Sequence, residues 1–129
     1  MKILLVEPGR VPRPAEIEHD LHAMQEIVGG AIQAVYPWQD SVALVCNDEG
    51  KLLNLPYNRV LEDYDIISGT LFICGIKGDD FTDLNETQLK NYTEMFEYPE
   101  RFLHTPEGIV CLKVVSAPEK QNKSKDYER

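Results

Sequence analysis

The side chains best suited to bind a ligand lie in the segment Asn-Leu-Pro-Tyr-Asn-Arg, residues 54–59. Its proline restricts the backbone, and a restricted loop loses little conformational entropy when it binds a partner. The guanidinium of Arg59 has the geometry to form paired hydrogen bonds with a carboxylate or a phosphate. We therefore predict a binding site for a small anionic ligand, lined by Lys51, Asn58, Arg59 and Arg10.

The same residues also fit a purely structural role. Asparagine side chains commonly hydrogen-bond to the backbone of a turn, which would occupy Asn58. Arg59 would then pair with an acidic side chain of the protein. The sequence favours this structural interpretation slightly, and both interpretations stay open.

Acidic side chains are concentrated between residues 79 and 100, where seven acids accompany a single base, Lys90. Carboxylates at phosphate-like spacing would suit the basic groove of a DNA-binding enzyme, so a DNA-mimic inhibitor is an alternative function. The residues assigned to that surface are Asp79, Asp80, Asp83, Glu86, Glu94 and Glu97. The stretch lacks the glycine and the closing glutamate of an EF-hand loop, so no calcium site is predicted.

No metal site is predicted elsewhere. His19, His22 and Glu26 have the spacing of ligands on one helical face, but no further histidine or cysteine lies near them in the sequence. That face lies opposite the apolar side of the predicted helix, so we expect it to be exposed to solvent.

The chain also lacks a recognisable nucleophile. Each of its three cysteines, Cys46, Cys74 and Cys111, lies in an apolar run, and an odd count without paired spacing predicts reduced, buried and inert thiols. No serine occupies a Gly-x-Ser-x-Gly turn. The sequence therefore favours a protein that is not an enzyme and that uses no cofactor. A small enzyme whose site is assembled across the sheet remains an alternative.

The first half of the chain predicts strands at residues 2–7, 31–36 and 41–46, with one helix before the second strand. Apolar residues at three- and four-residue spacing form one stripe of that helix, from Ile17 to Val28. Pro14 suits its first turn, and Gly29 suits the left-handed residue that follows a helix. Residues 47–51 predict a hairpin turn, with Gly50 at positive φ and residues 51–54 pairing back.

The second half predicts a structured loop at residues 55–61 and a central strand at 70–76 that is apolar on both faces. A second helix follows, because Asn85 and Gln88 have the spacing of a capping box. A last strand is expected at 109–115. Residues 117–129 are polar and lysine-rich, and we expect them to be disordered.

Composition limits the classes of partner. The 129 residues carry a net charge of −9, which argues against direct binding to nucleic acid or to an anionic membrane. The apolar runs are too short for a membrane span or a signal peptide. We expect a cytoplasmic protein.

Several ordered motifs resemble a family of domains of unknown function from bacteria, especially Firmicutes, and from their phages and conjugative elements. The motifs are Glu7-Pro-Gly, Met24-Gln-Glu-Ile-Val-Gly-Gly, Tyr36-Pro, Asn47-Asp-Glu-Gly-Lys, Leu55-Pro-x-Asn-Arg and Ile67-x-Gly-Thr up to Gly75. The resemblance implies a small protein on or near mobile DNA. It supplies no catalytic residue.

These observations predict an α+β domain over residues 1–116: a mixed, mostly antiparallel sheet of about five strands with two helices packed on it. The function expected first is binding without catalysis, in an accessory protein of a phage or mobile element. Its partner would be a protein from the host or the element, or a small anionic ligand.

Overall fold

The computed structural model describes residues 1–61 and 65–114, which form one main antiparallel sheet, two helices and two small hairpins. The main sheet has the order β2-β1-β7-β4-β3, and β8 pairs with β7. Its strands are β1 (Lys2–Val6), β2 (Arg13–Glu16), β3 (Ile32–Val35), β4 (Val42–Asn47), β7 (Leu71–Lys77) and β8 (Asp80–Thr82). The predicted α+β class and its antiparallel sheet with two helices are confirmed.

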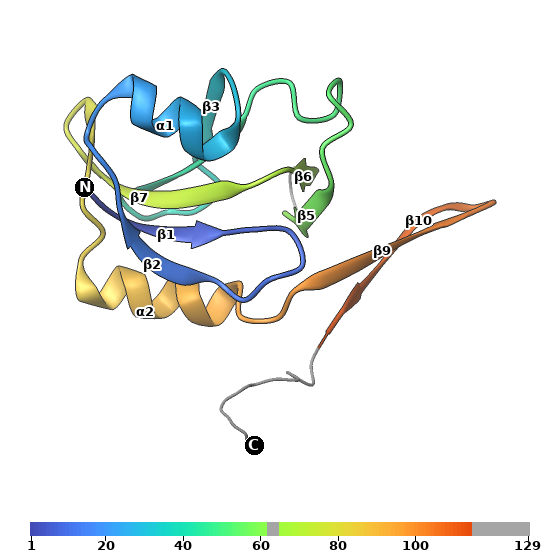
Figure 1. The fold of residues 1–129 in the computed structure, drawn as a ribbon. Helices are drawn as coiled ribbons and strands as arrows, with labels where there is room; N and C mark the ends of the chain where they lie inside the picture. The colour runs from blue at the N-terminus through green and yellow to red at the C-terminus, as the bar shows by residue number, and fades with distance from the viewer. Residues whose placement is uncertain (62–64, 115–129) are drawn as a thin grey trace.

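The two helices, α1 (Leu21–Val28) and α2 (Glu86–Met95), cover opposite faces of this sheet (Figure 1). Alternating residues of β4 build the two cores: Leu44 belongs to the core under α2, whereas Val45 belongs to the core under α1. Strand β7 lies between β1 and β4 and is buried on both faces from Leu71 to Gly75, as predicted for the central strand.

Helix α1 is shorter than the sequence predicted. It begins after Asp20, whose carboxylate accepts a hydrogen bond from the backbone N–H of Ala23. Pro14, expected in its first turn, lies instead in edge strand β2 opposite Leu4. A proline fits there because the outer side of an edge strand needs no N–H donor. The end of the helix is as predicted, since Gly29 has a φ of 81° in the left-handed region.

Helix α2 begins with the predicted capping box. The side chain of Asn85 accepts a hydrogen bond from the backbone N–H of Gln88 at 2.7 Å. In return, the side chain of Gln88 accepts one from the backbone N–H of Asn85 at 3.1 Å. These reciprocal bonds satisfy two N–H groups that the helix itself leaves unpaired.

The predicted hairpin after β4 is wrong. Strand β4 pairs with β3 and β7, and residues 48–54 form successive turns. Gly50 does not have the positive φ expected of it. A glycine is needed there because a Cβ atom would lie 2.7 Å from the carbonyl oxygen of Ser68. The turns therefore pack closely against β6.

Two short hairpins complete the structure, and three of their strands were not predicted. The segment expected to be a loop contains β5 (Tyr57–Val60), which pairs with β6 (Ile66–Ser68). Strand β9 (Glu100–Thr105) pairs with β10 (Gly108–Lys113), which corresponds to the expected last strand.

The predicted tail at residues 117–129 and the domain boundary at residue 116 lie outside the described residues. Neither of the described helices has the length and apolar character needed to cross a bilayer.

Candidate functional site

Arg59 and Asn58, the two main residues of the predicted ligand site, are completely buried. One guanidinium nitrogen of Arg59, Nη2, donates to the carbonyl oxygens of Arg10 at 2.8 Å and Phe96 at 3.1 Å. The other, Nη1, donates to the backbone and side-chain oxygens of Asn58 at 3.1 and 2.9 Å. The guanidinium thus joins the connector after β1, the C-terminus of α2 and strand β5.

Asn58 extends the same network. Its Nδ2 atom donates to the carbonyl oxygens of Val6 and Gly69, both at 2.8 Å. These bonds match the structural role that the sequence offered for Asn58. Arg59 differs from that interpretation because its acceptors are carbonyl oxygens, and burial lowers its pKa although nearby Glu100 opposes the change.

The predicted anion site is therefore divided. Asn58, Arg59 and the backbone of Arg10 come together, but the Arg59 guanidinium uses its four hydrogen bonds on Asn58, Arg10 and Phe96. A ligand would reach Arg59 only if the segment carrying Arg10 moved. Lys51 lies elsewhere, beside an open cavity.

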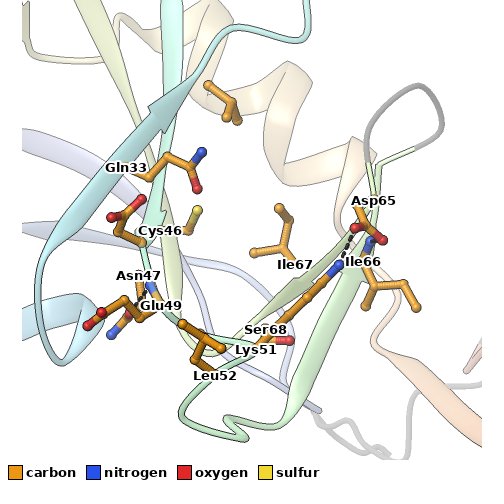
Figure 2. Close-up of a pocket in the computed structure, with 13 residues that line it drawn as sticks. Gln33, Cys46, Asn47, Glu49, Lys51, Leu52, Asp65, Ile66, Ile67 and Ser68 are labelled. Carbon is orange, nitrogen blue, oxygen red and sulfur yellow. Dashed lines mark hydrogen bonds and ion pairs between the residues drawn. The ribbon is translucent and has the colours of Figure 1, made fainter.

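That cavity, which we call the Lys51 cavity, has a volume of about 350 Å³. It lies between the β3–β4 end of the sheet, the turns after β4 and strand β6 (Figure 2). Ligand pockets in proteins range from about 300 to 1,000 Å³, so the space suits a small molecule. It is lined by Gln33, Val35, residues 46–52 and residues 65–68.

The walls of the Lys51 cavity combine apolar and polar groups. Figure 2 shows Gln33 and Cys46 on one side and Ile67 on the other, with Lys51 reaching toward Asp65. Gln33 is exposed on β3, so its amide is open to solvent, and it has no side-chain hydrogen bond within residues 1–61 and 65–114. The thiol of Cys46 is buried, which raises its pKa and keeps it protonated.

The charges around this cavity are mainly negative. Asp48, Glu49 and Asp65 contribute three carboxylates, against the single ammonium of Lys51. Lys51 donates to Asp65, and this hydrogen bond lowers the pKa of the Asp65 carboxyl group. The cation that was expected to bind an anion is thus already paired.

A larger groove of about 780 Å³ lies between β2 and the start of α2. Its polar groups are largely engaged within the protein. Asp83 accepts from the backbone N–H of Lys2 at 2.8 Å, and Asn85 caps α2. The Lys51 cavity is therefore the better candidate for a ligand.

The six acidic residues assigned to a DNA-mimic surface are all exposed. Two of them have partners in the protein. Asp80 lies 3.3 Å from His19 Nε2, and Asp83 bonds to the backbone of Lys2. The others, Asp79, Glu86, Glu94 and Glu97, extend from the end of β7 along α2 and beyond it.

The remaining candidates for chemistry are the histidines near α1 and the cysteines. The histidine–glutamate pair His22 and Glu26 is exposed, and no group of three metal-binding side chains occurs in the described part of the chain. Cys74 is buried, which raises its pKa to about 12. Cys111 is only half-buried, contrary to the prediction that all three thiols are buried, because it lies on strand β10 of a hairpin outside both cores. Burial together with its bond to Glu100 raises its pKa to about 11.

Comparison with protein families assigns residues 1–97, which hold both cores and the cavity, to one family. Residues 1–97 match the model of a family described as a domain of unknown function, DUF3846. The chain belongs to this family. No curated protein and no solved structure matches the chain.

The DUF3846 region includes the whole main sheet, both helices, the β5–β6 hairpin and the Lys51 cavity. The match ends before β9, so the β9–β10 hairpin lies outside the matched residues.

Sequence reasoning missed most of the residues that line the Lys51 cavity. Gln33 carried no signal, because a polar residue in an edge strand is ordinary. Asp65 and Ile67 were assigned to the start of an apolar segment. The cavity depends on β6 turning back against the end of β4, and no local pattern in the sequence specifies that contact.

Proposed function

We propose that this DUF3846 protein is a binding protein whose Lys51 cavity takes a small molecule with a cationic amine and an apolar body. The observation that carries the proposal is the composition of the cavity wall. The lining combines the exposed amide of Gln33 and three carboxylates with apolar side chains such as Val35 and Ile67. This combination fits an ammonium group that is attached to a hydrocarbon chain.

An anionic ligand is less suited to this cavity. It would have to displace Asp65 from Lys51 and would still face Asp48 and Glu49. An amine would meet Asp48 and Glu49 while Asp65 stays paired with Lys51. The proposal thus keeps the binding function expected from the sequence and changes the charge of the ligand.

The test is a titration of isotope-labelled protein followed by amide NMR. We expect n-butylamine and agmatine to shift the amide signals of Gln33, Lys51 and Ile67, and butyrate at the same concentration to leave them unchanged. Binding by butyrate alone would instead support the prediction of an anionic ligand and reject the amine. Absence of shifts with all three probes would reject the cavity as a site for small charged molecules.

A matched pair of variants separates the cavity from the general negative charge. Asp65→Asn removes one carboxylate from the cavity, and an exposed charge pair contributes roughly 0.2–1 kcal/mol. We therefore expect amine binding to weaken by about 1.4- to fivefold. Asp79→Asn makes the same chemical change at an exposed position outside the cavity and should leave the affinity unchanged.

The motif resemblance supports a biological setting for this binding protein, namely an accessory factor of a bacterium, phage or conjugative element.

A second function is supported by the exposure of the six acids from Asp79 to Glu97. A DNA mimic would bind a basic enzyme groove in competition with DNA, and its affinity would fall steeply with salt. Binding that is insensitive to salt would reject that mechanism.

A further inference from the structure

The β9–β10 hairpin projects from the body of the protein (Figure 1). Strand β9 holds it in place. The rings of Phe102 and Tyr57 meet at 5.3 Å, and the carboxylate of Glu100 accepts from the backbone N–H of Val60 at 2.8 Å. Strand β10 pairs with β9, and no pairing of its other edge occurs within residues 1–61 and 65–114.

The backbone of β10 directs alternate hydrogen-bonding groups to this free edge. The N–H of Val114 donates to the carbonyl of Pro99 on the β9 side at 2.8 Å. Successive residues of a strand point their backbone groups to opposite sides. Val110 therefore faces β9, whereas Ile109, Cys111 and Lys113 present N–H and C=O groups to the open edge.

Features that usually protect an edge strand are absent from β10. Proteins commonly block such edges with proline, central charges or bulges. Residues 108–113, Gly-Ile-Val-Cys-Leu-Lys, contain no proline, their only charge is at the end, and their register with β9 is regular. One face of the hairpin is also apolar and open, with Leu103 47%, Val110 42% and Leu112 50% exposed.

We propose that the free edge of β10 pairs antiparallel with β10 of a second copy, about a two-fold axis at Val110. In this register Ile109 lies opposite the partner's Cys111, and their outward backbone groups meet. Glu107 lies opposite the partner's Lys113, so each dimer gains two pairs of opposite charge. The product is a four-stranded sheet with the apolar face continuous across the axis.

The charges identify the occupant of this edge as a second copy and fix its register. Glu107, in the turn that precedes β10, and Lys113, at the end of β10, are the charged residues on either side of its apolar run, and reversing the strand brings them toward each other. Exposed ion pairs add little affinity, but they select one register over its neighbours. The net charge of −9 on each copy opposes association, so dimerisation should require high protein concentration or added salt.

The test is sedimentation equilibrium of the full chain under reducing conditions, across protein and salt concentrations. We expect a monomer–dimer equilibrium that Val110→Lys weakens by at least about tenfold, since it places two like charges at the axis. Leu52→Lys makes a matched change at a position that is 81% exposed on the turns after β4. It should leave the dimer intact, and circular dichroism confirms that both variants fold.

A charge swap tests the register. Lys113→Glu should weaken the dimer, and adding Glu107→Lys should restore it. A chain that is monomeric at all concentrations would overturn the proposal. A dimer insensitive to Val110→Lys, or a double swap that fails to restore association, would also overturn it, because the contact would then lie elsewhere or in another register.

Discussion

The guanidinium of Arg59 is held by carbonyl oxygens from three segments that are distant in the sequence. Because one of these is the carbonyl of Phe96 at the end of α2, the cation also lies where the helix dipole favours positive charge. Its Nε atom has no hydrogen-bond partner within the described residues. This arrangement makes Arg59 a structural link between β5, α2 and the connector that carries Arg10.

Arg59→Met should therefore reduce the free energy of unfolding by about 2–4 kcal/mol, because it leaves buried carbonyl oxygens without donors. Arg13→Met is the control, since that side chain is 60% exposed and lies 3.5 Å from Glu7 in a surface ion pair. Urea unfolding followed by circular dichroism measures both. A loss no larger than that of the control would show that Arg59 is not a structural link.

The sequence identified Asn58 and Arg59 as unusual residues but did not determine their role. An arginine that binds a ligand and one that binds carbonyl oxygens have the same local sequence. The difference lies in the positions of Arg10 and Phe96, which are brought to Arg59 only by the tertiary fold.

At the level of elements, helix α2 is attached to the rest of the fold by a polar contact as well as by its apolar face. The hydroxyl of Tyr92 donates to Asp40 at 2.8 Å, and the side-chain amide of Gln88 approaches the same carboxylate at 3.3 Å. The bond from Tyr92 lowers the pKa of Asp40 below its ordinary value of 3.8. Asp40 lies in the connection between β3 and β4, so the contact ties α2 to that connection.

This lowered pKa predicts how stability depends on pH. A carboxyl group with a lowered pKa in the folded state stabilises the fold above its unfolded pKa, and the contribution is lost as the pH falls through the folded value. Asp40→Asn should therefore cost less than about 1 kcal/mol at pH 7, because the carboxylate is largely solvated. The difference from the wild type should begin to shrink near pH 3.8 and disappear only once the pH is well below the lowered pKa of the folded state. A difference that persists there, in acid unfolding curves, would contradict the assignment.

Elements with strong local signals were predicted well, and elements without them were not. The capping box at Asn85 and the left-handed Gly29 fixed one end of each helix. Strands β2 and β5 were missed because each has a proline within or beside it, which local rules treat as a break. Pairing with β1 and β6 overrides that preference, and such pairing is not encoded locally.

At the scale of the whole molecule, the DUF3846 region contains all elements of the main sheet and both cores, and the β9–β10 hairpin is attached to it. The contacts between the two parts are few and include those of Phe102 with Tyr57 and Glu100 with Val60. The buried residues of both cores thus all lie in the DUF3846 region, and none of them lies in the hairpin.

A chain ending at residue 98 should therefore still fold cooperatively, with a free energy of unfolding lower by about 1–3 kcal/mol than that of the full chain. The loss arises because Tyr57 and the region around Arg59 become more exposed. Circular dichroism and urea unfolding check this. A truncated chain without a cooperative transition would show that the hairpin is part of the core.

The central position of β7 also has a consequence for the growing chain on the ribosome. Strand β1 pairs with β7, but β7 is made only after 64 intervening residues, Glu7 to Thr70. At about 5–20 residues per second, that interval lasts roughly 3–13 s. During this time β1 can pair with β2 alone, and its apolar residues lack their final neighbours. Newly made chains should therefore depend on holding chaperones until β7 emerges and joins the two halves of the sheet.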